Sequence, residues 1–147
     1  MNRYNGTDFY VFRPVKGDKN SLYNNNIGTI CGDKQGHIYI RCKYAVVEYD
    51  IKKNTFHTIR DNDIQAITYD NARLWVCTRD SLFTYNRVED RLDYYYNLEG
   101  VRMSCVTEDS AGNLYVGTMN NGLYMIDHNK KWLNYFPKKD ITHLRRL

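Results

Sequence analysis

The sequence predicts an all-β protein built from a repeated unit of four short antiparallel strands. Three observations support this: a segment pattern that occurs three times, a spacing of nearly forty residues between its copies, and alternating apolar and polar residues within the segments. Ile27, Ile64 and Met103 open matching segments, and Ile141 opens a fourth, at intervals of 37 to 39 residues. A period near forty is typical of stacked supersecondary units.

Each copy is predicted to contain four strands. The first segment has apolar residues at its first and fourth places and an acid at its seventh, the second and third segments alternate with a period of two, and the fourth carries two large residues three apart. The first segments read IGTICGD, IQAITYD and MSCVTED, the second HIYIRC, RLWVCT and NLYVGT, and the third AVVEYD, SLFTYN and GLYMID. The pairs in the fourth segments are Phe56 and Ile59, Leu92 and Tyr95, and Trp132 and Tyr135. Short strands joined by two to six turn residues form one meandering antiparallel sheet.

Such sheets pack face to face as the blades of a β-propeller, so the sequence predicts a partial β-propeller with three complete blades and partial blades at both ends. The Trp-Asp pair of a WD-type repeat is missing. We expect one domain, 1–147, divided into the end of a blade at 1–12, a connection at 13–26, blades at 27–59, 64–96 and 103–136, and the start of a further blade at 141–147.

A closed propeller needs about four to eight blades. Three blades fall short, so we expect blade faces such as those bearing Phe9, Phe12 and Trp132 to be partly uncovered. Self-association, or pairing with the remainder of a larger propeller, is therefore predicted.

The stretch 109–127, DSAGNLYVGTMNNGLYMID, has the glycines of a ligand-binding loop but not its other requirements. A P-loop has a lysine immediately before its serine or threonine, whereas here Gly117 precedes Thr118 and Met119 follows it. A calcium loop needs a carboxylate at its twelfth position, where this stretch has Asn120. The glycines disappear in the other copies while the apolar pattern persists, which indicates turn residues. We expect no cofactor.

No catalytic or metal-binding set is predicted, and the chain is not expected to be an enzyme. Asp33, Asp70 and Asp109 recur immediately before a turn, where a carboxylate accepts backbone N–H groups. Glu108 lies beside Asp109, but adjacent side chains on a strand point to opposite faces. The chain has no Gly-x-Ser-x-Gly elbow, and its four histidines share no short spacing.

The four cysteines, Cys31, Cys42, Cys77 and Cys105, all fall on predicted strands without a Cys-x-x-Cys spacing. We predict four unpaired thiols that act as small apolar residues. The repeat also predicts that the aromatic residues Tyr39, Trp75 and Tyr115 occupy equivalent places on second strands.

Residues 103–126 combine apolar-x-x-apolar, an acid, Gly-Asn-Leu-Tyr, Gly-Thr and Gly-Leu-Tyr. This pattern resembles the two-component-regulator propeller repeat, which is found in the extracytoplasmic sensor region of bacterial hybrid histidine kinases. Residues 2–27 resemble the passage between two such repeats. The other two copies depart from it, with Arg41-Cys42 and Cys77-Thr78 where Gly-Thr is usual.

The resemblance implies a non-catalytic, periplasmic ligand-sensing module of a membrane-anchored signalling kinase, and glycan breakdown products are the ligands we expect. Similar repeats resemble those of streptogramin-lyase-like propellers, so an extracellular enzyme stays an alternative. A protein-interaction scaffold is a third possibility.

A ligand site can be placed by topology. In an antiparallel meander the turns between second and third strands share one end of the sheet with the connections between blades, and loops on a rigid scaffold are the usual binding elements. The candidate ligand-binding residues on these turns are Tyr44, Arg79, Asp80, Asn120 and Asn121.

Composition is that of an ordinary globular protein, with 42% hydrophobic and 26% charged residues. No apolar run approaches the roughly twenty residues that span a bilayer, and the first fifteen residues lack the apolar core of a signal peptide. The net charge of +4 comes partly from Lys138, Lys139, Arg145 and Arg146 near the end of the chain. A solvated edge explains them, so we expect neither a nucleic-acid partner nor direct membrane contact from this segment.

Overall fold

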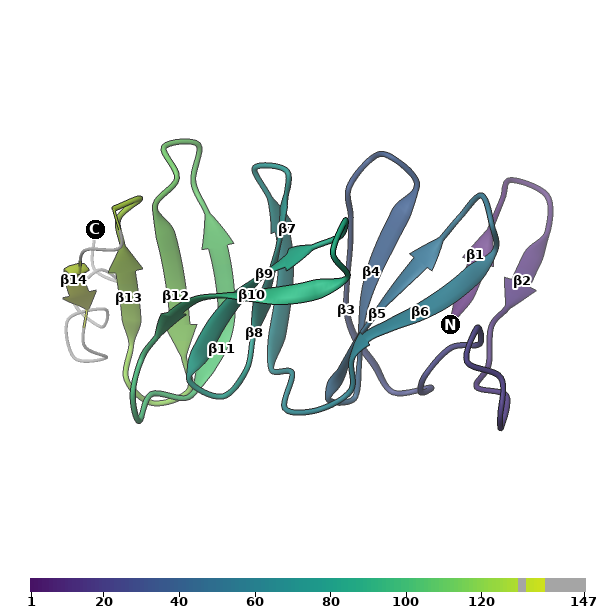
Figure 1. The fold of residues 1–147 in the computed structure, drawn as a ribbon, viewed down its shortest axis with the longest axis horizontal. Coiled ribbons are helices and arrows are strands. Elements are labelled where there is room, and N and C mark those ends of the chain that lie inside the picture. The colour runs from purple at the N-terminus through teal and green to yellow at the C-terminus, as the bar shows by residue number, and fades with distance from the viewer. Residues whose placement is uncertain (130–131, 137–147) are drawn as a thin grey trace, which may run out of the picture. The chain divides into compact units, whose positions relative to one another are not determined.

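The computed structural model describes residues 1–129 and 132–136, and the expected blade start at 141–147 lies outside them. The described residues contain no helix and form fourteen strands in four antiparallel sheets (Figure 1). The first sheet has two strands, β1 (Asn2–Tyr4) and β2 (Phe9–Val11).

The other three sheets have four strands each, paired in the order of the sequence. The first of them holds β3 (Ile27–Gly32), β4 (His37–Cys42), β5 (Ala45–Asp50) and β6 (Thr55–Arg60). The second holds β7 (Ala66–Asp70), β8 (Arg73–Cys77), β9 (Ser81–Asn86) and β10 (Arg91–Asn97). The third holds β11 (Met103–Glu108), β12 (Leu114–Thr118), β13 (Leu123–Ile126) and β14 (Trp132–Phe136).

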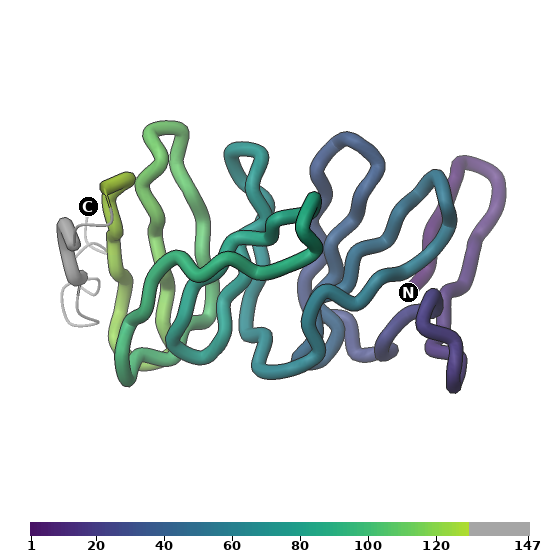
Figure 2. The backbone as a smooth tube through the Cα atoms, viewed as in Figure 1, coloured from purple at the N-terminus to yellow at the C-terminus, as the bar shows by residue number. Residues whose placement is uncertain are grey.

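The predicted fold class is confirmed, because each four-stranded sheet is the meander of a propeller blade and the chain runs up and down through one sheet before it enters the next (Figure 2). One strand starts later than its sequence segment: β7 begins at Ala66, not at Ile64. Gln65 still donates its N–H to the carbonyl of Cys77 at 2.8 Å, so the backbone pairing extends one residue beyond the strand.

The predicted equivalence of three aromatic residues is also confirmed. Each of them pairs with the fifth residue of the preceding segment: Tyr39 with Cys31, Trp75 with Thr68, and Tyr115 with Thr107. The repeat therefore preserves the strand register although the turn after Asp70 is one residue shorter.

The chain divides into two compact units, Met1–Ile64 and Gln65–Leu147. In the first unit the core is formed by Leu22, Ile40, Cys42, Val47, Tyr49 and Phe56. In the second unit the core includes Trp75, Leu82, Met103, Leu114, Val116 and Ile126, all at most 1% exposed. Full burial of one such aliphatic side chain contributes about 1.5–3 kcal/mol.

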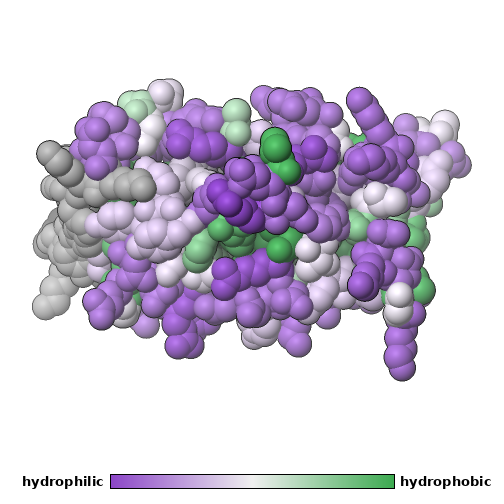
Figure 3. All heavy atoms as spheres, viewed as in Figure 1, coloured by the Kyte–Doolittle hydropathy of each residue, from purple (hydrophilic) through white to green (hydrophobic). Residues whose placement is uncertain are grey.

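The first unit exposes apolar surface that the second unit buries at equivalent positions. Ile30 is 52% exposed, whereas its counterparts in the repeat, Ile67 and Val106, are 4% and 7% exposed. In the second unit β11 packs against β7 and β8, and Val106 lies in the core of that unit. Phe9 is 73% exposed. Hydrophobic atoms accordingly show at the surface beside β1 and β2 (Figure 3).

Of the three aromatic residues expected to be partly uncovered, Phe9 is exposed and Phe12 is half-buried against Tyr49 and Phe56. The side chain of Trp132 lies outside the described part of the structure.

All four cysteines lie on strands, as predicted, but they differ in burial. Cys42 and Cys77 are buried, and burial raises the pKa of both thiols. Cys105 is exposed, so the expectation of an apolar core position is wrong for this residue. Its Sγ occupies space beside Gly117, where an added Cβ would overlap it.

Candidate functional site

Asp109 holds its own turn, as the sequence predicts. Its Oδ1 accepts the N–H groups of Ala111 and Asn113, both at 2.9 Å, and its Oδ2 accepts the Tyr115 hydroxyl at 3.2 Å. The side-chain and backbone hydrogen bonds from Asn113 are the main reason why the pKa of Asp109 is lowered. The carboxylate is therefore a structural group.

Asp33 holds its own turn in the first unit in the same way as Asp109 does in the second. Its carboxylate accepts the N–H groups of Gln35 at 2.7 Å and His37 at 3.0 Å, and it contacts the imidazole of His37. Partial burial favours a higher pKa for Asp33, but the hydrogen bonds from His37 and Gln35 outweigh it and lower the pKa.

Asp70 departs from this pattern. The turn that follows it consists of Asn71 and Ala72, which have φ values of 45° and 59°, as in a two-residue type I′ turn. Its Oδ2 accepts the N–H of Glu108 at 3.0 Å and the hydroxyl of Thr107 at 3.1 Å. Asp70 thus joins β7 to β11 of the next blade, so the prediction that it serves its own turn is wrong.

Glu108 and Asp109 point to opposite sides, as expected for neighbours on a strand. The Glu108 side chain is 1% exposed and accepts the indole N–H of Trp75 at 2.7 Å and a guanidinium N–H of Arg73 at 2.9 Å. The two carboxylates cannot act together on a substrate.

The predicted binding end of the second unit is a continuous hydrogen-bonded edge, which we call the loop rim: residues 79–80, 98–102 and 119–121. The carbonyl of Asp80 accepts the N–H of Leu98 at 2.7 Å, and the carbonyl of Arg79 accepts the N–H of Met103 at 2.8 Å. The carbonyl of Arg102 accepts the N–H of Met119 at 2.9 Å. The turn at 79–80, the connection at 98–102 and the turn at 119–121 therefore form one ordered edge.

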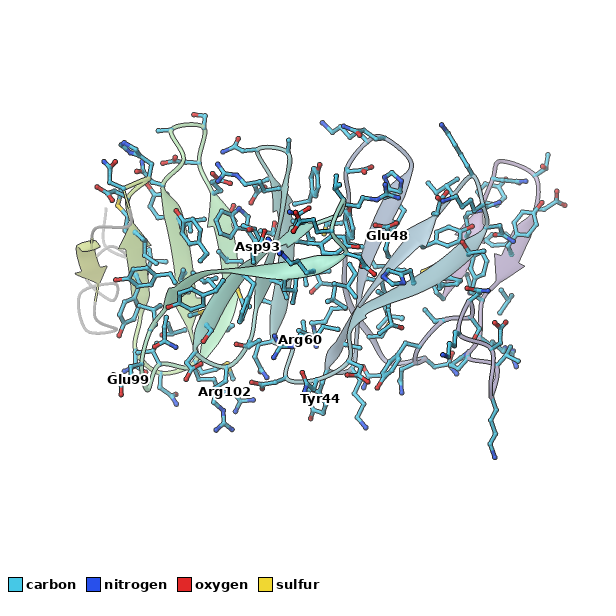
Figure 4. The ribbon with its side chains drawn as sticks, in the orientation of Figure 1. Tyr44, Glu48, Arg60, Asp93, Glu99 and Arg102 are labelled. Atoms are coloured by element: carbon cyan, nitrogen blue, oxygen red, sulfur yellow. The ribbon has the colours of Figure 1, made fainter. Side chains whose placement is uncertain are left out.

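A hollow of about 390 Å³ opens in the loop rim, lined by Arg79, Asp80, Gly100 and Arg102. Arg102 projects from the connection away from the strands, as does the neighbouring Glu99 (Figure 4). Guanidinium groups bind carboxylate, sulfate or phosphate through paired N–H donors, and a carboxylate such as Asp80 accepts from hydroxyl groups. The lining therefore combines donors suited to anionic groups with one acceptor suited to hydroxyl groups.

The structure distributes the five sequence-predicted residues between the two units. Arg79 and Asp80 line the hollow; Asn120 and Asn121 belong to the same rim, where the N–H of Asn121 donates to the Thr118 hydroxyl at 2.9 Å. Tyr44 belongs to the first unit, where it is 54% exposed.

Arg102 was not predicted from the sequence. It lies in a connection that the topology places at the binding end. Its arginine side chain is the only feature of the sequence that could have identified it as a candidate.

A second arginine explains one departure from the repeat. Arg41 stands where the third copy has Gly117, and its guanidinium lies over Gly28, where an added Cβ would overlap it. Its Nη1 donates to the carbonyl of Lys43 at 2.9 Å, which holds the turn that presents Tyr44. Among the described residues, its Nε has no hydrogen-bond partner.

Within residues 1–129 and 132–136, no group of three or more histidine, cysteine or acidic side chains is arranged to hold a metal ion. The same residues contain no helix that is both long and apolar enough to cross a membrane.

One segment of the chain is similar to a known protein family. Residues 97–120 match the family described as two component regulator propeller, which confirms the resemblance stated from the sequence. No curated protein matches the chain.

Solved structures share its fold at low sequence identity. The extracellular domain of the putative hybrid two component system BT3049 from B. thetaiotaomicron has 22% identity and a TM-score of 0.75 over 93% of this chain. The corresponding domain of BT4673 from the same organism has 23% identity and a TM-score of 0.67 over 81%. The chain covers only 22% and 17% of those two domains.

Proposed function

We propose that this chain is part of the extracytoplasmic ligand-sensing propeller of a hybrid two-component sensor and that it has no catalytic role. Support comes from the family match at residues 97–120 and from the fold that the chain shares with extracellular domains of hybrid two component systems. A periplasmic location follows from this proposal.

The observation that carries the proposal is the loop rim of the second unit. Its hollow presents two arginines and one aspartate on backbone fixed by hydrogen bonds between successive turns. Polar groups on a pre-formed edge suit recognition, because little conformational entropy is lost when a ligand binds.

Glycan breakdown products are the ligand class we propose for this edge. Their hydroxyl groups can donate to Asp80 and accept from Arg79 and Arg102, and acidic sugars can in addition pair with the guanidinium groups. In the first unit, exposed Tyr44 on the equivalent turn is a separate candidate, with an aromatic face on which sugar rings can stack.

Signalling would require the ligand to bind one arrangement of the sensor more tightly than another, since only differential affinity shifts a conformational equilibrium. The chain itself is expected to associate with itself or with the remainder of a larger propeller.

The test is calorimetry of the complete sensor region against a panel of oligosaccharides, with a turnover assay on the same panel. We expect saturable binding without product. Replacing Arg79 and Arg102 by glutamine should weaken binding by about tenfold or more. Arg91→Gln, at the start of β10 and outside the loop rim, is the control that should leave affinity unchanged.

Bond cleavage that depends on a histidine or carboxylate of this chain would support the lyase alternative instead. Unchanged affinity in the double variant would show that the loop rim is not part of the binding site.

A further inference from the structure

The first unit contains a connection unlike the others. Residues 12–26 join β2 to β3 without forming a strand, whereas the two later blades are joined by much shorter links. Irregular connections of this length are uncommon in compact domains and usually have a function.

The connection is held in one conformation by its own hydrogen bonds. The N–H of Asp18 donates to the carbonyl of Val15 at 3.1 Å, with Gly17 at φ 86° in the turn between them. The Ser21 hydroxyl accepts the N–H of Val15 at 2.9 Å and donates to the carbonyl of Asp18 at 2.9 Å.

Two contacts fix this connection to the blade. Leu22 is 1% exposed and belongs to the core of the first unit. The N–H of Phe56 on β6 donates to the carbonyl of Asn20 at 3.0 Å. The connection therefore lies along β6 as a rigid element, not as a free loop.

A hollow of about 670 Å³ lies between the connection and β6. Its volume is within the roughly 300–1,000 Å³ of small-molecule sites. It is lined by Pro14, Val15, Lys16, Asp18, Lys19, Ser21, Leu22, Tyr23, His57 and Thr58. All of these residues belong to the first unit, so this hollow is separate from the one in the loop rim.

The charge of the hollow favours an anion. Lys16 and Lys19 both line it, and the one acidic residue of its lining, Asp18, uses Oδ1 to accept the N–H of Asn20 at 2.9 Å. Val15 and Tyr23, which are 57% and 40% exposed, add an apolar wall.

β6 adds a hydrogen-bonding edge. Phe56 directs its N–H away from β5, to Asn20, and backbone groups alternate along an antiparallel strand. The N–H and C=O of Thr58 therefore also point away from β5, on the side of the hollow. A ligand can satisfy both groups.

We propose that this hollow is a second ligand site, which binds a small molecule carrying an anionic group together with hydroxyl or amide groups. Lys16 and Lys19 pair with the anion, Thr58 exchanges hydrogen bonds with the neutral polar groups, and Tyr23 covers one face. This site does not depend on the loop rim or on the proposed sensing role.

The test uses the whole chain, labelled with ¹⁵N, and two sugars that differ in one group: glucuronate and glucose. We expect glucuronate to shift the amide signals of the connection and of Thr58 in a saturable way, and to bind about tenfold or more tightly than glucose. Inorganic phosphate, which lacks the neutral groups, should also bind at least tenfold more weakly.

The variant Lys16→Gln with Lys19→Gln should lose about tenfold in glucuronate affinity. Its matched control is Lys34→Gln with Lys52→Gln, which removes the same charge from exposed turns outside the hollow and should change nothing.

Three results would overturn the proposal. They are saturable shifts that appear only at the loop rim or nowhere, equal affinities for glucuronate and glucose or phosphate, and equal losses in the two double variants. Loss of the loop-rim arginines should leave this binding intact, which separates its failure from that of the proposed function.

Discussion

The carboxylate of Glu108 accepts the indole N–H of Trp75 at 2.7 Å across 33 residues of sequence. Both groups are buried, and Arg73 completes the cluster from the surface, with a half-exposed guanidinium. This relationship ties the second strand of one blade to the first strand of the next.

We expect Glu108→Ala to lower the free energy of unfolding by about 2–3 kcal/mol, because the buried indole N–H loses a charged acceptor. Glu108→Gln keeps an acceptor for Trp75 and should cost about 1 kcal/mol. Denaturant unfolding would measure both. Glu89→Ala is the control, since Glu89 forms an exposed ion pair with Arg91 and should matter by less than about 1 kcal/mol. Equal effects of Glu108→Ala and Glu89→Ala would contradict the assigned role.

The turn acids predict a dependence of stability on pH. The pKa values of Asp33 and Asp109 are lowered in the fold from their ordinary value of 3.8. Their contribution is therefore complete above pH 3.8 and is lost as the pH falls through the lowered values. Unfolding of Asp33→Asn with Asp109→Asn, followed across acid pH, should show a shallower loss than the unmodified chain. Asp61→Asn, at an exposed position, should leave the slope unchanged.

Equivalent apolar positions should differ in their contribution to stability. Val106→Ala should cost about 2–3 kcal/mol because it leaves a cavity between β11 and the blade at 66–97. Ile30→Ala removes a half-exposed side chain and should change stability by about 0.5 kcal/mol or less. Thermal unfolding of the two variants would compare them, and a large cost at Ile30 would show that this position is covered in solution.

The cysteines should react in order of burial. Cys105 is exposed and should react first with a thiol reagent, whereas burial raises the pKa of the Cys77 and Cys42 thiols and should protect them until the chain unfolds. Titration under denaturing, non-reducing conditions should count four thiols; a count of two would reveal a disulfide.

The exposed apolar surface of the first unit predicts association. Phe9 and Ile30 are largely uncovered, and surfaces of this kind favour contact with another chain. Light scattering over a dilution series should show a mass that rises with concentration. A monodisperse monomer at high concentration would contradict this expectation.

The strand pattern was readable from the sequence because side chains alternate on strands and the repeat shows that alternation three times. Tyr39, Trp75 and Tyr115 share one register for this reason. The binding end was also predictable in outline, since the topology of a meander decides which turns share an end.

Contacts between sheets could not be predicted in the same way. Nothing in the segment ending at Glu108 shows that its carboxylate reaches Trp75 and Arg73 of the preceding blade. Arg102 likewise gains its place in the loop rim from backbone hydrogen bonds that join two turns. Such partners are far apart in sequence, and pattern arguments treat each segment alone.

The two-residue turn after Asp70 has a consequence for how the second unit unfolds. In an array of identical repeats, each repeat can unfold separately. Its stability is the sum of its own intrinsic stability and of the interfaces with its two neighbours. Because the short turn leaves Asp70 to bind β11, opening the blade at 66–97 also breaks hydrogen bonds of the blade at 103–136. A single-residue deletion in a turn thereby strengthens nearest-neighbour coupling, so the two blades should lose amide-exchange protection together.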